Sequence, residues 1–388
     1  MREWQIVVRG IIREKSIGGQ NMKKDSRLTL LFGFLLLGGL IAVSSVIFSP
    51  VPGKAASDYV IRLGYYNCDH MTAAPVAKDA GIYEKLGLKV DVTGTGKVPE
   101  AMAAGQMDVG YISFAGMVRA IQKGSPMVAV AGNHVGGSMY LVVRKEIKKP
   151  QDLIGKKLGI GPLPEKNNDR WIWFARTAGI PAEGKNYECF AMADKDKYLA
   201  LKTGQLDAYD TCDPWGSMAE YENTGNIMHM FGALPSGKWG ICCPLVMNKT
   251  FLKEHLQLVP KIIQAHSEAI QLIYTQPLKA ANIFAKNYFV PLEVALMTIY
   301  RKTVGETRTL RWKIYRDGYE EQIKHLLWLG TIDTAPKFEE IMDPEFLAQS
   351  GVVDFDAFIK EKVNPIFPLG MTYADWKKKA QQIDGKPL

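Results

Sequence analysis

Cysteine and histidine are the residue types here that most readily do chemistry, and they occur at irregular intervals along the chain. The chain contains five cysteines, at Cys68, Cys189, Cys212, Cys242 and Cys243. Their number is odd and no CxxC pair occurs, so neither a disulfide framework nor a zinc ribbon is indicated. Adjacent cysteines pair with each other only under strain, so any disulfide of Cys242 or Cys243 is expected with Cys212 or Cys68.

A soft-metal site is one chemistry that these residues could support. Thiolates together with imidazole suit zinc or Cu(I), and Cys68, His70, Cys212 and Cys242 or Cys243 could supply them. Their spacings match no known local metal motif, and buried, inert thiols are common in proteins. The sequence therefore favours a protein without a bound metal or other cofactor, and the soft-metal site remains the alternative.

The segment Gly94-Thr95-Gly96-Lys97 is similar to a phosphate loop but fails its pattern. GxxxxGK[ST] requires glycine where Asp91 stands and serine or threonine where Val98 stands. What remains is a turn between a strand and a helix, either purely structural or able to bind an anionic oxygen through backbone N–H groups. No GxSxG or HExxH motif occurs, so hydrolytic catalysis is not expected and the sequence indicates a non-enzyme.

Two acidic segments stand where a predicted strand gives way to a helix. In Cys68-Asp69-His70, the carboxylate could cap the next helix or, with the imidazole, contact a ligand. In Asp213-Pro214-Trp215, the proline suits the first turn of a helix. The indole there could stack on a ligand or pack inside its own domain.

Positive charge is concentrated at the start of the chain. The formal net charge is +8, but residues 1–56 hold eight Lys/Arg and three acids, so +5 of it lies there and +3 in the remainder. No basic run occurs in that remainder, which argues against a nucleic-acid partner.

An uncharged apolar run of 21 residues spans 28–48, with three basic residues at 23–27 before it and small residues at 55–57 after it. This is typical of an export signal, and an uncleaved membrane anchor is the alternative. We therefore expect a leader at 1–56 and a periplasmic protein that touches the membrane only through this segment or a membrane partner.

The rest of the chain alternates strand and helix patterns, and part of it repeats. Two motifs recur 98 or 99 residues apart: Ala80-Gly81-Ile82 with Ala178-Gly179-Ile180, and Gly105-Gln106-Met107-Asp108 with Gly204-Gln205-Leu206-Asp207. Alternation predicts βαβ units, and the ordered recurrence predicts two similar lobes in tandem.

These patterns predict an α/β fold of two lobes, each a mostly parallel sheet flanked by helices. The expected boundaries are a leader at 1–56, the first part of lobe 1 at 57–145, lobe 2 at 146–238, and a return to lobe 1 with C-terminal helices at 239–388. A two-stranded hinge is expected near 144–155 and 233–244. Single helices are expected at 73–85, 251–274 and 312–329, among others.

Five segments in order resemble a known family. They are IRLGYY with PVAKDAGIYEKLGLKVDV, AMAAGQMDVGYISFAG, KKPQDLIGKKLGI, ALKTGQLDAYDTCDPWG and PLVMNKTFLKEHLQLVPKIIQAHSEAI, within residues 58–330. The chain thereby resembles periplasmic substrate-binding proteins of ABC importers, of the nitrate/sulfonate/taurine and pyrimidine-precursor type. The resemblance implies a venus-flytrap fold, a small-molecule solute bound between the lobes, docking onto ABC permease subunits, and no catalysis. A monomer is the default, because such a cleft needs no partner subunit.

The resemblance also implies which loops line the cleft. Carried over position by position, the candidate ligand-binding residues are Tyr66, Asn67, Asp69, His70, Gly96, Lys97, Ser113, Phe114, His134, Asp210, Asp213 and Trp215. Aromatic faces with carboxylates suit a flat, amine-bearing solute. Gly96, Lys97, Ser113 and His134 would instead suit a sulfonate or nitrate. The first kind of solute is slightly favoured.

Two other functions remain open beside an importer subunit. The same fold resembles the pyrimidine synthase of thiamin biosynthesis, to whose cysteine-rich cluster Cys242-Cys243 bears a faint likeness. A sensor subunit that hands the closed form to a signalling receptor would carry the same cleft.

Overall fold

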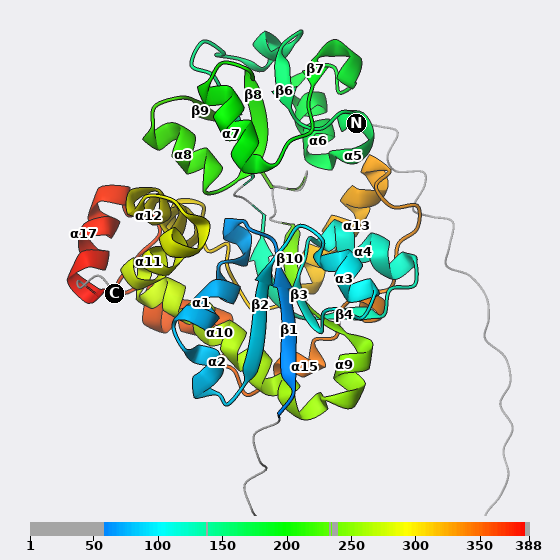
Figure 1. Cartoon of the computed structure of the whole chain (residues 1–388), viewed down its shortest axis with the longest axis vertical. Coiled ribbons are helices and arrows are strands. Elements are labelled where there is room, and N and C mark those ends of the chain that lie inside the picture. Colours follow the sequence, from blue (N-terminus) through cyan, green and yellow to red (C-terminus); the bar gives the residue numbers. More distant parts are fainter. Residues whose placement is uncertain (1–57, 137–138, 233, 235–239, 385–388) are drawn as a thin grey trace, which may run out of the picture. The chain divides into compact units, whose positions relative to one another are not determined.

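Two five-stranded sheets organise the residues that the computed structural model describes, 58–136, 139–232, 234 and 240–384 (Figure 1). The expected leader lies outside these residues. Among the described residues, no helix combines the length and the apolar character that crossing a bilayer requires.

Strand order within each sheet explains how the chain passes between them. The first sheet has the order β2-β1-β3-β10-β4, with β1 Val60–Tyr65, β2 Lys89–Gly94, β3 Val109–Tyr111, β4 Met127–Val135 and β10 Ile241–Asn248. The second has the order β7-β6-β8-β5-β9, with β5 Met139–Val143, β6 Lys157–Gly159, β7 Glu188–Cys189, β8 Ala208–Cys212 and β9 Asn226–Phe231. Strands β10 and β5 run antiparallel to both of their neighbours, and the other pairings are parallel. The prediction of two lobes with mostly parallel sheets is confirmed.

The chain crosses from the first sheet to the second between β4 and β5, and returns between β9 and β10. The expected link at 144–155 is therefore wrong, because Met139–Val143 already pairs with β8 and β9. All five residues of this strand are buried. A uniformly apolar strand of this kind gives no sign of which sheet it joins.

Helices cover both sheets and follow the strands in chain order. Those around the first sheet are α1 Ala73–Asp79, α2 Ile82–Lys85, α3 Val98–Ala103, α4 Phe114–Gln122, α9 Lys249–Glu254, α10 Val259–Thr275, α11 Pro277–Tyr288, α12 Leu292–Tyr300, α13 Arg316–Leu329, α14 Phe338–Ile341, α15 Glu345–Ala348, α16 Phe355–Phe358 and α17 Tyr373–Asp384. Those of the second are α5 Pro164–Asn167, α6 Asp169–Ala178, α7 Asp194–Lys202 and α8 Trp215–Tyr221. The single helix expected at 73–85 is two, because Gly81 adopts φ 71° between them. The helix expected at 251–274 is also divided, and the one expected at 312–329 begins only at Arg316.

The repeated Gly-Gln-x-Asp motif ends a helix and anchors the following strand in both lobes. Gly105 and Gly204 adopt φ 69° and 77° at the ends of their helices, which glycine does without steric cost. The carboxylate of Asp108 accepts a hydrogen bond from the Arg62 N–H at 2.8 Å, and Asp207 accepts one from the Lys157 N–H at 3.0 Å. Each aspartate thus fastens the start of its strand to the neighbouring parallel strand.

His266 of α10 is buried against the first sheet and both ring nitrogens are paired. Nε2 lies 2.8 Å from the Gly132 carbonyl oxygen and Nδ1 lies 3.0 Å from the Tyr111 hydroxyl. A neutral ring satisfies both contacts, donating to the carbonyl and accepting from the hydroxyl. Burial lowers the pKa of His266 to about 4.

This histidine predicts a loss of stability in mild acid. Histidine in the unfolded chain has a pKa of about 6.5, so the unfolded state takes up the proton first. Stability from this group is complete above pH 6.5 and falls as the pH drops, by roughly 2 kcal/mol at pH 5. Urea unfolding measures the free energy of unfolding at pH 7 and at pH 5. Its decrease between these two pH values should be about 2 kcal/mol smaller for His266→Gln than for the wild type, because the glutamine amide can make both hydrogen bonds and does not titrate. Equal losses in the two proteins would contradict this assignment.

Candidate functional site

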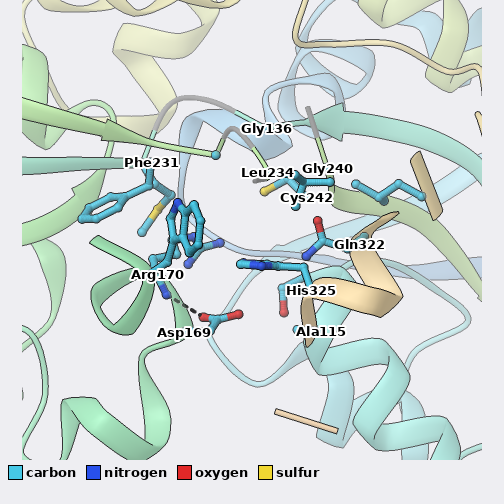
Figure 2. A pocket seen from close by; sticks show the side chains of 15 residues that line it. Ala115, Gly136, Asp169, Arg170, Phe231, Leu234, Gly240, Cys242, Gln322 and His325 are labelled. Carbon is cyan, nitrogen blue, oxygen red and sulfur yellow. Dashed lines mark hydrogen bonds between the residues drawn. The ribbon is translucent and has the colours of Figure 1, made fainter. Parts of the chain in front are cut away.

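A cavity lies between the two sheets, and both lobes contribute to its wall (Figure 2). The first lobe supplies Ser113, Ala115, Gly136, Gly240, Ile241, Cys242, Gln322 and His325. The second supplies Met139, Asp169, Arg170, Trp173, Phe231, Gly232 and Leu234. Open α/β sheets bind ligands beyond the carboxyl ends of their strands, which is where this cavity lies.

Two helix N-termini, one from each lobe, lie at the cavity wall. Helix α4 follows β3 and is capped by Ser113, whose hydroxyl accepts a hydrogen bond from the Gly116 N–H at 3.2 Å. Helix α6 follows the short helix α5, which comes after β6, and is capped by Asn168, whose side-chain oxygen accepts a hydrogen bond from the Trp171 N–H at 3.0 Å. First-turn N–H groups and the positive end of a helix dipole both favour an anion.

Arg170 adds a full positive charge in the first turn of α6. Burial opposes its charge, but the neighbouring Asp169 carboxylate and the cleft thiols raise the pKa of the guanidinium, so it stays protonated. Among the residues described, this guanidinium forms no ion pair, and the Asp169 carboxylate acts on it only through its charge. The Asp169 carboxylate instead accepts a hydrogen bond from the Arg170 backbone N–H at 3.2 Å.

The positive character continues into an adjoining hollow. Its wall shares Ser113, Ala115, Asp169 and Arg170 with the cavity and adds Arg119 and Lys166. Both additional cations are exposed. The cavity and its mouth are therefore basic, with Asp169 as the one carboxylate among the described lining residues.

Aromatic rings form the apolar part of the cavity wall and join the lobes. Trp173 of α6 makes edge-to-face contacts with His325 and Trp328 of α13, at centroid distances of 5.6 and 5.4 Å. Phe231 at the end of β9 completes the apolar wall. Burial lowers the pKa of His325, so this ring is neutral near pH 7 and acts as part of the wall.

Of the predicted ligand-binding residues, Ser113 lines this cavity, whereas the three aspartates lie elsewhere. Asp69, Asp210 and Asp213 are buried. Their carboxylates pair with Lys302 at 2.6 Å, with Lys197 at 2.8 Å and with Arg301 at 3.4 Å, respectively. The carboxylate-rich cleft that favoured an amine-bearing solute does not form, because each acid pairs with a cation of the protein.

The other predicted residues fall into three groups. Tyr66, Phe114 and Trp215 pack in the cores, where Trp215 stacks on Tyr198 at 5.7 Å. Asn67, Gly96 and Lys97 are exposed near the end of β2, an edge strand. His70 and His134 are buried, and His134 borders a separate hollow beside β4.

Sequence reasoning missed most of the cavity wall, namely Asp169, Arg170, Trp173, Phe231, Gln322 and His325. The side-chain cap at Asn168 marks the start of the helix that carries Arg170. A capped helix start after a strand was thus the available signal for Arg170.

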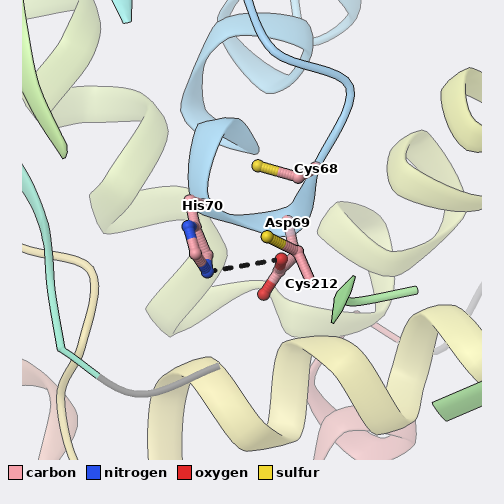
Figure 3. A group of neighbouring side chains, drawn as sticks. All are labelled: Cys68, Asp69, His70 and Cys212. Atoms are coloured by element: carbon pink, nitrogen blue, oxygen red, sulfur yellow. Dashed lines mark ion pairs between the residues drawn. The ribbon is translucent and has the colours of Figure 1, made fainter. Parts of the chain in front are cut away.

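A second feature, which we name the cysteine–histidine cluster, adjoins the cavity. It consists of Cys68, His70, His134, Cys212, Cys242 and Cys243. His70 stands in its middle, with Cys68 and Cys212 close to it (Figure 3). The Cys242 Sγ lies 3.5 Å from His70 Nδ1 and 3.3 Å from the Cys243 Sγ. The rings of His70 and His134 stack at 4.0 Å. All five cysteines are free thiols.

The cluster contains thiols of opposite character. The hydrogen bond from Cys243 and the positive field of the two imidazoles lower the pKa of the Cys242 thiol well below its usual value. Burial raises the pKa of Cys243, and the hydrogen bond with Cys68 and burial raise that of Cys212. Cys242 is also the cluster member on the cavity wall.

The sequence matches the model of the NMT1-like family over residues 54–286, more than half of the chain. The chain belongs to the NMT1-like family. Among curated relatives, a binding protein of Brucella abortus is 32% identical over 117 residues. That alignment covers 28% of this NMT1-like chain and 35% of the relative, so the match spans about a third of the relative's length.

Solved structures share the fold of this NMT1-like protein at low identity. A ligand-binding component of an ABC-type import system from Staphylococcus aureus, with zinc bound, has a TM-score of 0.62 at 15% identity and covers 75% of this chain and 99% of its own. The aliphatic sulphonate binding protein SsuA of Escherichia coli has a TM-score of 0.59 at 16% identity, and the match covers 74% of this chain and 92% of SsuA. The nitrate-binding protein NrtA of Synechocystis PCC 6803 has a TM-score of 0.59 at 15% identity, and the match covers 84% of this chain and 98% of NrtA. The NMT1-like chain thus has the two-lobed fold of solute-binding proteins of ABC importers.

Proposed function

We propose that this protein is the extracytoplasmic solute-binding component of an ABC-type importer and that it captures a small organic anion between its lobes. The observation that carries the proposal is the position of Arg170, a charged side chain on the wall of an interlobe cavity without an ion-pair partner among the described residues. A solute anion would supply the missing counter-charge. The N-termini of α4 and α6 would donate to the same anion from the two lobes.

The rest of the wall favours an organic anion over a bare inorganic one. Trp173 and Phe231 offer apolar faces that nitrate would leave unused. The Asp169 carboxylate would accept a hydrogen bond from an N–H or O–H group of the solute and would repel a second negative charge. An amino- or hydroxy-sulfonate, such as taurine, has both parts. This reverses our slight preference for an amine-bearing or pyrimidine-like solute.

The mechanism we propose is closure on the solute. A ligand that contacts both lobes binds the closed form more tightly and shifts the population toward it. The two chain crossings would serve as the hinge. We assign lobe 1 to residues 58–136 and 240–384 and lobe 2 to residues 139–232. The closed form would dock on the transmembrane subunits of a permease as a monomer without catalysing a reaction, and the N-terminal export pattern supports a periplasmic location.

Titration calorimetry with taurine, ethanesulfonate and nitrate tests this function. The sulfonates should bind, and Arg170→Gln should weaken them roughly 100-fold, because a charge-assisted hydrogen bond to a buried anion contributes about 2–3 kcal/mol. Lys185→Gln, which removes one positive charge from an exposed site in the same lobe, should bind like the wild type. Equal affinity in Arg170→Gln, or binding of amines alone, would refute the anion site.

A further inference from the structure

We propose that the cysteine–histidine cluster binds one thiophilic d10 metal ion, Zn(II) or Cu(I), through His70, His134 and Cys242, with Cys243 beside the fourth position. The ligand atoms of the first three all lie within 4.8 Å of one another. Cys242 shares the cavity wall with Arg170, but none of the proposed metal ligands is a residue proposed to bind the anion, so the metal site does not depend on which solute is transported.

The spacing of the donor atoms fits a single ion. Thiolate and imidazole ligands at 2.0–2.3 Å from one tetrahedral zinc ion lie roughly 3.3–3.8 Å apart. The Cys242 Sγ is 3.5 Å from His70 Nδ1, and the Cys243 Sγ is 3.3 Å from the Cys242 Sγ and 3.9 Å from His70 Nδ1. The thiols of Cys242 and Cys243 are thus close to ligand spacing from His70, whereas His134, whose ring is stacked on that of His70, would have to turn its ring to bring a nitrogen to the ion. Thiolate with imidazole is the donor set that zinc and Cu(I) prefer.

A break in strand regularity brings the two adjacent thiols together. In a regular strand, successive side chains point to opposite faces. The β10–β4 ladder shifts register on both sides of Cys243, which pairs with His134, while Cys242 is the extra residue between two paired positions. Such bulges redirect side chains and cluster at functional sites. Pro244, which has no N–H to donate, follows directly.

His134 gives an independent indication of a missing ligand. Its side chain is 1% exposed, and neither ring nitrogen has a hydrogen-bond partner among the described residues. Buried polar atoms in native proteins are nearly always paired, so such a ring indicates that an ion or a water molecule binds beside it. A metal at the Cys242 side would satisfy one of these nitrogens.

His70 is oriented as a metal ligand would be. Its Nε2 faces the Asp69 carboxylate at 3.7 Å (Figure 3). The other ring nitrogen, Nδ1, lies 3.5 Å from the Cys242 Sγ and 3.9 Å from the Cys243 Sγ. Histidines that bind metals commonly direct the other ring nitrogen to a carboxylate, which fixes the ring and its tautomer. Asp69 is itself held by Lys302 at 2.6 Å. Cys242 lines the interlobe cavity, which gives an ion a path to the site.

Metal retention by the full-length protein tests the site. Purified reduced protein is loaded with Zn²⁺, or with Cu⁺ under anaerobic conditions, desalted, and analysed for bound metal by mass spectrometry. We expect the protein to retain one equivalent of at least one of these ions. The retained ion identifies the metal that the site binds. Competition with a chromophoric chelator should show Cys242→Ser and His134→Asn weakened more than about 100-fold, because even outer partners of metal ligands contribute 10–100-fold.

Two matched thiol variants locate the ion. Cys212→Ser removes a thiol that is not in the group of His70, His134 and Cys242, and Cys189→Ser removes one in β7 of the second lobe, so both should bind like the wild type. Cobalt substitution should give thiolate-to-cobalt absorption in the wild type that is absent from Cys242→Ser. Circular dichroism confirms that each variant is folded. The proposal is overturned if the folded wild type retains neither ion, or if Cys242→Ser retains it with unchanged affinity.

Discussion

Replacement of Lys302 by methionine is expected to lower the free energy of unfolding by about 3–5 kcal/mol at pH 7. Lys302 lies in the π-helical turn after α12, and both it and its partner Asp69 are fully buried, with Nζ 2.6 Å from Oδ2. Glu306 lies 3.6 Å from the same ammonium and accepts a hydrogen bond from the Tyr140 hydroxyl of β5. Loss of the cation would leave a carboxylate without compensation in the core.

The pH dependence gives this expectation a second test. Burial raises the pKa of Asp69 to about 6 even with Lys302 and His70 beside it. Without Lys302 the pKa must rise further, since the opposing positive charge is gone. When the pKa of a carboxyl is higher in the folded state than in the unfolded state, the carboxyl lowers the stability of the protein only at pH values above its pKa in the unfolded chain. The deficit of Lys302→Met should therefore be smaller at pH 5 than at pH 7.

Chemical unfolding at both pH values would measure the effect. Lys313→Met is the matched control, because Lys313 pairs with Asp354 and Asp356 at the surface and should cost less than about 1 kcal/mol. The double variant Asp69→Asn/Lys302→Met should recover part of the loss. A Lys302→Met protein as stable as the control would refute the account of this pair.

Replacement of Arg301 by methionine is expected to separate the lobes in the solute-free protein. Its guanidinium reaches from the end of α12 to α8 of the second lobe, 2.5 Å from the Ser217 hydroxyl and 3.4 Å from the Asp213 carboxylate, and it also pairs with Glu220. Asp213 is fully buried and accepts hydrogen bonds from the N–H and hydroxyl of Ser217 at 2.8 and 2.7 Å. With Arg301 gone, closed lobes would hold an uncompensated charge at a cost of about 3–5 kcal/mol.

Opening would hydrate that carboxylate, so the population should shift toward the open form by roughly 100-fold or more. Small-angle scattering should report a larger radius of gyration for Arg301→Met, and unfolding should begin at a lower denaturant concentration. Arg316→Met removes the same charge from an exposed pair with Glu339 and should change neither quantity. An unchanged radius together with unchanged stability would contradict the role of Arg301 between the lobes.

The sequence was sufficient for the architecture because the signals for it are local. Gly81, Gly105 and Gly204 mark helix ends, and the repeated aspartates Asp108 and Asp207 mark the strands that follow. Local propensity and spacing are visible within a few residues. The same reasoning failed at Met139–Val143, where only pairing across the fold decides which sheet the strand joins.

The cavity residues were harder to predict from the sequence, because the residues that contact one another there are far apart along the chain. Asp69 and Asp213 looked available for a solute, but their partners Lys302 and Arg301 lie far along the chain. No local pattern indicates that a carboxylate will be neutralised by such a residue. The grouping of Cys68, His70, Cys212 and Cys242 or Cys243 was foreseen as an alternative from residue type alone, whereas His134 was placed there by the β10–β4 ladder.

The placement of β10 also fixes the order in which the molecule can be completed. All strands of the second sheet come from one continuous stretch, 139–231, so that sheet can close as soon as this stretch has emerged. The first sheet cannot, because β10 must insert between β3 and β4, and β4 ends more than 100 residues earlier. Until residue 248 is available, β3 and β4 present unpaired edges, which favour aggregation. A chain that emerges N-terminus first therefore finishes its second lobe before its first, and β3 and β4 are the strands that wait for their partner.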